Sequence, residues 1–162
     1  MEAQKQKLKR TQKEISKPED FTDPEVLFEV LINTFWGLGA CNDLSMVEKA
    51  YKLARDAHKD QKRKSGEPYI IHPLCVAIIL AELELDKETI VAGILHDVVE
   101  DTTATLEDLS REFNDEVALL VDGVTKLGQL SYSHDKMDLQ AENLRKMFLA
   151  MAKDIRVILI KL

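Results

Sequence analysis

The residues best suited to chemistry are His96, Asp97, Glu100 and Asp101, which lie in the short stretch "HDVVED". On a helix, side chains three or four positions apart share a face, so this spacing gathers four ionisable groups within little more than one turn. The preceding run "TIVAGIL" is typical of a buried helix, and burying unpaired carboxylates costs several kcal/mol unless they are hydrogen-bonded or coordinated. A divalent cation would remove that cost, so the stretch indicates a metal site.

A second histidine, His72, opens the segment "HPLCVAIILAEL", where Pro73 suits the first turn of a helix. His72, His96 and Asp97 are able to converge on one ion as two imidazoles and a carboxylate. This mixture suits Mn²⁺, Fe²⁺, Zn²⁺ or Ni²⁺ without choosing among them. The spacing leaves a second interpretation open, in which the histidines are core residues satisfied by their neighbours. A third histidine, His58, is interpreted as a surface or helix-end residue.

Helices must position these groups, because apolar side chains recur at helical spacing nearly throughout the chain. Four of the helical patterns follow residues that favour N-caps, namely Asp23, Ser45, Asp86 and Thr105. Ser45 with Glu48 also matches a capping box. Alternating strand patterns of useful length are absent. We therefore predict an all-α fold, a bundle of about six to eight helices, interrupted by loops at residues 62–70 and 128–136.

Composition predicts one globular domain, because the chain has 162 residues, of which 45% are hydrophobic and 31% are charged. The net charge of −7 argues against nucleic acid or an anionic membrane as a partner. No uncharged apolar run approaches the length of a membrane span, and "MEAQKQKLKRTQKE" is unlike a signal peptide, which predicts a cytoplasmic protein. Residues 1–20 are interpreted as a flexible basic tail before a domain at residues 21–162.

An "HD" pair with a distant upstream histidine is typical of the HD superfamily of metal-dependent phosphohydrolases, which this sequence resembles. Its resemblance to one branch is closer. The stretches "AHKDQKRKSGEPYIIHP", "GILHDVVEDT", "VDGVTKLG", "AENLRKM" and "DIRVILIKL" are similar, in this order, to signatures of the hydrolase domain of the RelA/SpoT family of (p)ppGpp synthetase/hydrolases. The similarity covers residues 45 to 162, and several ordered motifs are far more specific than a lone "HD".

This resemblance implies a role for each matching residue. It implies that His72, His96 and Asp97 bind Mn²⁺, while Glu100 and Asp101 act on the nucleophilic water and around the pyrophosphate. The loop residues implied to contact the guanine nucleotide, ppGpp or pppGpp, are Arg63, Lys64, Ser65 and Tyr69. The positive charges of Arg63 and Lys64 would bind phosphate groups, and Tyr69 would stack on or hydrogen-bond the base. The intact "HD" and "ED" pairs favour a hydrolase-competent type.

One departure concerns the fourth metal ligand of the family, the Asp of an "ADRLHN" motif that follows "VKL", since this sequence stops at "IKL". We expect a hydrolase domain truncated at its C-terminal end, with weakened metal binding, from a bifunctional synthetase/hydrolase. Two alternatives stay open: a non-catalytic regulatory or nucleotide-binding HD module, and an HD phosphohydrolase for another nucleotide. The apolar last helix also favours self-association into a homo-oligomer.

Overall fold

The computed structural model describes residues 22–37, 44–129, 141–142, 144–145 and 154–161. Eight helices have bounds within these ranges, and residues 141–142 and 144–145 are helical as well. The eight are α2 (Pro24–Gly37), α3 (Ser45–His58), α4 (Ile71–Glu82), α5 (Lys87–Leu95), α6 (Val98–Asp101), α7 (Leu106–Glu112), α8 (Asp115–Gln129) and α10 (Arg156–Lys161). The predicted all-α class is confirmed, since extended pairing in the described part of the chain amounts to an isolated bridge between Lys62 and Pro68. The predicted tail at residues 1–20 and most of the predicted loop at 128–136 lie outside the described residues.

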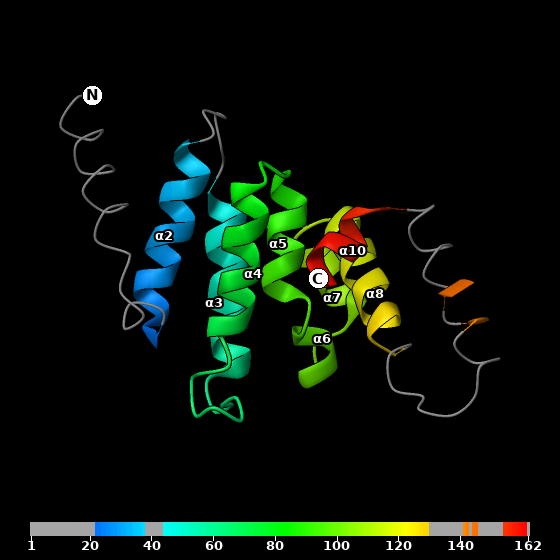
Figure 1. Cartoon of the computed structure of the whole chain (residues 1–162), viewed down its shortest axis with the longest axis horizontal. Coiled ribbons are helices and arrows are strands. Elements are labelled where there is room, and N and C mark those ends of the chain that lie inside the picture. Colours follow the sequence, from blue (N-terminus) through cyan, green and yellow to red (C-terminus); the bar gives the residue numbers. More distant parts are fainter. Residues whose placement is uncertain (1–21, 38–43, 130–140, 143, 146–153, 162) are drawn as a thin grey trace.

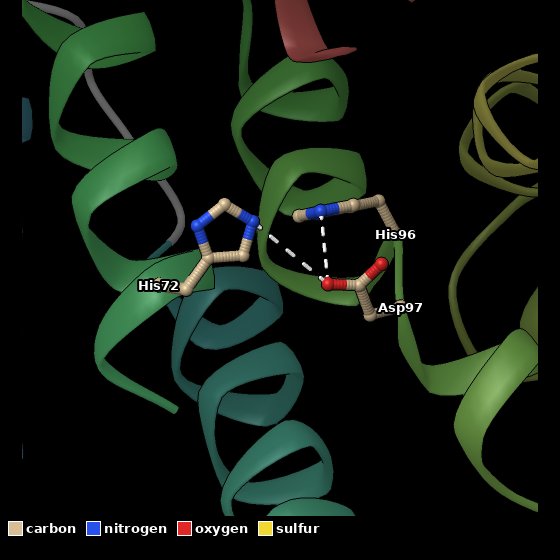
Figure 2. Close-up of side chains that lie close together, drawn as sticks. All are labelled: His72, His96 and Asp97. Atoms are coloured by element: carbon tan, nitrogen blue, oxygen red, sulfur yellow. Dashed lines mark ion pairs between the residues drawn. The ribbon is translucent and has the colours of Figure 1, made fainter. Parts of the chain in front are cut away.

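The helices α2, α3, α4 and α5 stand in an upright row, and α7, α8 and α10 gather beyond α5 (Figure 1). None of the described helices combines the length and apolar character that crossing a membrane requires. Helix α5 packs against α3, α4 and α8, which makes it the central element. The first turn of α4 faces the end of α5, and this is where His72 meets His96 and Asp97 (Figure 2).

The predicted helix starts follow local hydrogen bonding in two cases. Asp23 accepts a bond at Oδ1 from the backbone N–H of Glu25 at 3.0 Å, and Thr105 forms a complete capping box with Asp108. The N-cap predicted at Ser45 is one residue off, because α3 already includes Ser45 and Leu44 holds the cap position.

Asp86 stands at the N-cap position of α5, but its side chain does not cap the backbone. It accepts hydrogen bonds from the Thr89 hydroxyl and, at 2.7 Å, from the Arg156 guanidinium of α10. The same guanidinium contacts Glu116 of α8 at 2.7 Å and Asp154 at 2.7 Å. Arg156 therefore ties α10 to the starts of both α5 and α8.

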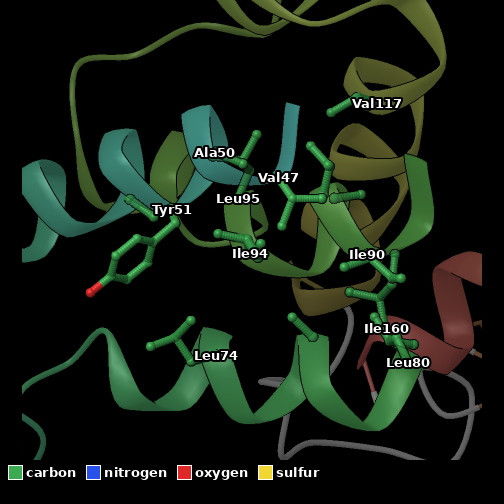
Figure 3. Packing of buried hydrophobic residues seen from close by; sticks show 14 of the residues in the cluster. Val47, Ala50, Tyr51, Leu74, Leu80, Ile90, Ile94, Leu95, Val117 and Ile160 are labelled. Atoms are coloured by element: carbon green, nitrogen blue, oxygen red, sulfur yellow. The ribbon is translucent and has the colours of Figure 1, made fainter. Parts of the chain in front are cut away.

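The core is one cluster of buried apolar side chains drawn from most of the helices. Leu74 and Leu80 of α4 face Ile90 and Ile94 of α5, and Ile160 brings α10 into the same cluster (Figure 3). The side chains named here are at most 2% exposed. Because burial of a large aliphatic side chain contributes about 1.5–3 kcal/mol, this packing fixes the mutual position of α4, α5 and α10.

Candidate metal centre

The candidate site forms where α5 ends. The helix expected to run from "TIVAGIL" into "HDVVED" is interrupted in the structure, since α5 stops at Leu95, α6 starts at Val98, and His96 and Asp97 form a turn between them. Both residues keep right-handed helical backbone angles. The turn directs their side chains toward His72, in the first turn of α4 (Figure 2). His96 is 4% exposed and Asp97 is 7% exposed, so the burial inferred for these two groups is correct.

One ligand atom from each of His72, His96 and Asp97 lies within 4.8 Å of the other two. The Asp97 Oδ2 atom is 3.1 Å from His96 Nε2 and 3.9 Å from His72 Nε2. The two imidazole rings meet edge to face, with their centroids 5.4 Å apart. Two imidazole nitrogens and a carboxylate oxygen are a donor set that first-row divalent metals accept, so the residues present fit a metal ion.

The hydrogen bond from His96 Nδ1 to the backbone carbonyl of Gly93, at 2.6 Å, fixes the tautomer of this histidine. A carbonyl oxygen only accepts, so Nδ1 carries the hydrogen and Nε2 is the atom that faces Asp97. Burial opposes a charge on His96, but the hydrogen bond and negative charge of Asp97 outweigh it and raise the pKa of His96. When His96 is protonated, the proton on Nε2 bridges to Asp97, and a metal ion would take the place of that proton.

The pKa of Asp97 is shifted the other way. Burial alone would raise it, but hydrogen bonds from His96 and Tyr69 lower the pKa of this carboxyl well below its usual range. Asp97 is therefore ionised at neutral pH, as a metal ligand must be. His72 has a lowered pKa because it is half-buried and lies beside His96. At 3.9 Å from Asp97, it is a neutral imidazole at neutral pH rather than a partner in an ion pair.

Tyr69 was predicted to contact the nucleotide, and its hydroxyl donates a 2.7 Å hydrogen bond to Asp97 Oδ2. Its pKa is raised, first by burial and then by this bond. The ring lies 4.7 Å from the ring of His58, which is 2% exposed. The interpretation of His58 as a surface residue is therefore wrong, although it does end α3. Sequence reasoning missed it because the polar neighbours in "RDAHKD" conceal that the Tyr69 loop folds over the helix end.

The other predicted carboxylates, Glu100 and Asp101, lie on α6 and are exposed. Partial burial and the charge of Asp97 raise the pKa of both side chains, so Glu100 and Asp101 interact electrostatically with the metal cluster. Burial inferred from the preceding apolar run does not extend to them, because α6 leaves the core after Val98. Lys161 of α10, which sequence reasoning did not select, places a positive charge that acts on Glu100 and both histidines of the cluster.

The remaining predicted residues occupy the loop between α3 and α4. A hydrogen bond of 2.8 Å from the Gly66 N–H to the Arg63 carbonyl closes the turn that carries Lys64 and Ser65, and Gly66 adopts the positive φ of 89° that this turn requires. Arg63, Lys64 and Ser65 are exposed. The positive charge of Arg63 acts on both Tyr69 and His72, which brings this side of the loop to the cluster.

A helical bundle in which a histidine of α4 meets an adjacent His-Asp pair at the end of α5 is what an HD domain requires. Residues 50–162 match the sequence model of the HD domain, and the chain belongs to the HD-domain family.

The predicted resemblance to a narrower group is also confirmed. The chain is 56% identical over 121 residues to the bifunctional (p)ppGpp synthase/hydrolase SpoT of Escherichia coli K12, covering 75% of this chain and 17% of that protein. It is 54% identical over 116 residues to the guanosine-3′,5′-bis(diphosphate) 3′-pyrophosphohydrolase of Aquifex aeolicus, covering 72% and 16%. It is 57% identical over 122 residues to the GTP pyrophosphokinase of Myxococcus xanthus, covering 74% and 16%. The chain thus spans about a sixth of the length of these relatives.

Proposed function

We propose that this chain is a metal-dependent (p)ppGpp 3′-pyrophosphohydrolase domain, which hydrolyses ppGpp to GDP and pyrophosphate. The observation that carries the proposal is the convergence of His72, His96 and Asp97 within 4.8 Å in an HD domain. Relatives whose names include this activity, at 54–58% identity, support the choice of substrate.

His72, His96 and Asp97 would hold the ion through Nε2, Nε2 and a carboxylate oxygen, and we propose Mn²⁺ as that ion. A bound divalent ion lowers the pKa of a water molecule and polarises a phosphoryl oxygen. Two features of the chain prepare the ligands for it. The Gly93 carbonyl orients His96 through Nδ1, and the Tyr69 hydroxyl orients Asp97 through Oδ2.

Glu100 and Asp101 are proposed as the catalytic carboxylates. They stand on α6, within about one turn of Asp97, and burial and the charge of Asp97 raise the pKa of both carboxyls, which makes them better proton acceptors than free carboxylates. One carboxylate would take the proton from the attacking water as it bonds to phosphorus, and the other, in its protonated form, would give its proton to the 3′ oxygen as the P–O bond to that oxygen breaks. Exposure of both residues leaves them reachable by a nucleotide.

The nucleotide itself is proposed to lie against the loop before α4. Arg63 offers a planar fork of donors to a phosphate, Lys64 a second cation, and Ser65 a hydroxyl, all on the exposed turn that Gly66 closes, and the charge of Arg63 acts on His72. Tyr69 is half-buried and already bonded to Asp97, so its contact with the base would be made by its ring.

The domain from residue 21 to 162, preceded by the basic tail, is proposed as the hydrolase part of a longer synthetase/hydrolase. This fits the small share of each relative that the chain covers. Cytoplasmic location, homo-oligomerisation and the lack of direct nucleic-acid binding remain predictions from the sequence.

A non-catalytic nucleotide-binding module is the second candidate. It is favoured because the Asp97 carboxylate is already satisfied without a metal ion. The Tyr69 hydroxyl and His96 Nε2 both contact its Oδ2 atom. In that case the cluster would be structural, and its groups would respond to protons rather than to metal.

Metal binding and nucleotide turnover separate the two candidates. The 162-residue chain is titrated with Mn²⁺ while its thermal unfolding is followed, and pyrophosphate release from ppGpp is measured in parallel. A site that binds is expected to stabilise the fold by about 2.7 kcal/mol at a hundredfold excess over Kd. Asp97→Asn should abolish both effects, and the matched control Asp122→Asn, which alters a partly exposed α8 carboxylate paired with Lys126, should change neither. The same measurements are made on a chain extended past Leu162 to include the Asp of the family motif, and absence of both Mn²⁺ stabilisation and activity in the two chains would refute the hydrolase proposal.

A further inference from the structure

Three residues from three helices meet beside the metal cluster, and the sequence motifs assigned a role to only one of them. Gly128 lies near the end of α8, Lys161 ends α10, and Glu100 lies on α6. A Cβ atom placed on Gly128 would be 3.1 Å from Lys161 Nζ and 3.5 Å from Glu100 Oε1. The ammonium and the carboxylate therefore flank the same small space, which the absence of a side chain at position 128 keeps open.

The surroundings of Glu100 explain why a cation is needed there. Asp97 and Asp101 are negative neighbours whose charges act on Glu100, and His96 and Lys161 act in the opposite sense. Without a cation beside it, a carboxylate on an exposed helix turn is pushed away from two like charges and samples several rotamers. A cation on the far side attracts it into one orientation.

We infer that Lys161 is a positioning residue, which holds the Glu100 carboxylate toward the reaction site across the gap left by Gly128. This inference rests on the proposed hydrolase function, in which Glu100 is a catalytic carboxylate. It adds to that function a residue from α10, 60 positions after the end of the "HDVVED" stretch.

The helix that carries Lys161 is anchored independently of Glu100. Val157 and Ile160 are 5% and 2% exposed, and Arg156 binds Asp86 and Glu116 at 2.7 Å each. Gly123 of α8 admits Val157, since a Cβ there would lie 2.7 Å from Val157 Cγ2. Because these contacts fix α10, the position of the lysine is determined by the fold rather than by its own partner.

The first test measures the interaction without metal or substrate. The side-chain carboxyl carbon of Glu100 is titrated by NMR in the metal-free 162-residue chain and in Lys161→Met, which keeps the length of the side chain and removes its charge. We expect the pKa of Glu100 to rise further in Lys161→Met. The matched control Lys126→Met removes an exposed α8 lysine that pairs with Asp122 and should leave Glu100 unchanged. An unchanged pKa in Lys161→Met would overturn the inference.

The second test asks whether position matters as well as charge. In the Mn²⁺-loaded chain acting on ppGpp, Lys161→Met is expected to lower kcat about ten- to a hundredfold, the size of effect that misplacing a catalytic group produces. KM should change less than about twofold, and Lys161→Arg should recover part of the loss. Gly128→Leu fills the gap while keeping both charges, and it should lower kcat too. Gly37→Leu is its control, because a Cβ at Gly37 meets nothing within 4 Å.

The outcomes distinguish failure of this inference from failure of the proposed hydrolase function. A rise in KM at constant kcat would mean that Lys161 binds the substrate and does not position Glu100, which would overturn the inference. Normal kcat in Gly128→Leu would also overturn it. Absence of turnover in the unmodified chain would refute the proposed function, while the NMR titration would still decide whether Lys161 holds Glu100.

Discussion

Replacing Gly93 by alanine should both destabilise the fold and weaken metal binding. Gly93 lies on α5, three residues before His96, where α5 packs against α4. A Cβ at this position would be 2.7 Å from Leu80 Cδ1 and 3.5 Å from Val76 Cγ1, both on α4. Contacts of 2.7 Å between carbon atoms are repulsive, so either the buried leucine changes rotamer or the two helices move apart.

The size of the stability change in Gly93→Ala follows from two opposing effects. Forcing an extra methyl group into a packed core costs about 1–3 kcal/mol. Alanine in place of glycine in a helix stabilises by up to about 1 kcal/mol. Gly37→Ala, at the last residue of α2, is a control without the steric effect, because its Cβ would meet nothing within 4 Å. We expect Gly93→Ala to be less stable than Gly37→Ala by about 1–3 kcal/mol, which lowers Tm by about 2–12 °C in a domain of this size.

The metal site should respond because α4 carries His72 and the end of α5 carries His96 and Asp97. Separating these helices moves one ligand away from the other two, and the Gly93 carbonyl that orients His96 moves with them. Circular dichroism melts with and without Mn²⁺ measure both effects. The stabilisation by Mn²⁺ should be smaller in Gly93→Ala than in Gly37→Ala.

A second substitution, at Leu80, tests whether the steric clash with this side chain causes the loss of stability. Leu80→Ala alone should cost about 2–5 kcal/mol, because Leu80 is 1% exposed. Combined with Gly93→Ala it should cost less than the sum of the two changes, since the new methyl group enters the space that the leucine leaves. If Gly93→Ala is as stable as Gly37→Ala, or if the double variant shows no coupling to Leu80, the close approach of α4 and α5 is refuted.

Three further predictions concern the helices that surround the site. The pKa of Tyr51 is raised to about 12, chiefly by burial and then by its hydrogen bond to Glu25, so the stability that it contributes below pH 10 should be lost between pH 10 and 12. Tyr51→Phe should flatten this decline in urea denaturation across that range. Arg156→Met should cost about 1–2 kcal/mol, because it removes several half-exposed ion pairs. The hydrogen bond from Arg156 lowers the pKa of Asp154, so the contribution of this pair is present above about pH 4 and is lost on further acidification, and the variant should lose less stability there. Thr105→Ala should cost about 0.5–2 kcal/mol in a thermal melt by removing the α7 cap, and an unchanged Tm would contradict the capping box.

Local chemistry alone was enough to predict much of this protein. The helical spacing of apolar residues indicated the all-α class, and the caps at Asp23 and Thr105 formed as predicted because each bond joins residues two or three positions apart. The ordered motifs also led to the correct family. The grouping of His96 with Asp97 followed from adjacency, and the loop at Gly66 followed from its glycine and proline.

Only the tertiary structure decided which distant groups share the site. It buried His58 under Tyr69, exposed Glu100 and Asp101 by interrupting the helix, and brought Lys161 beside Glu100. It also redirected Asp86 from a helix cap to Arg156, 70 positions away. No local pattern encodes such contacts, because they depend on how whole helices pack, and that packing is determined by the summed burial of many side chains rather than by the residues that finally meet.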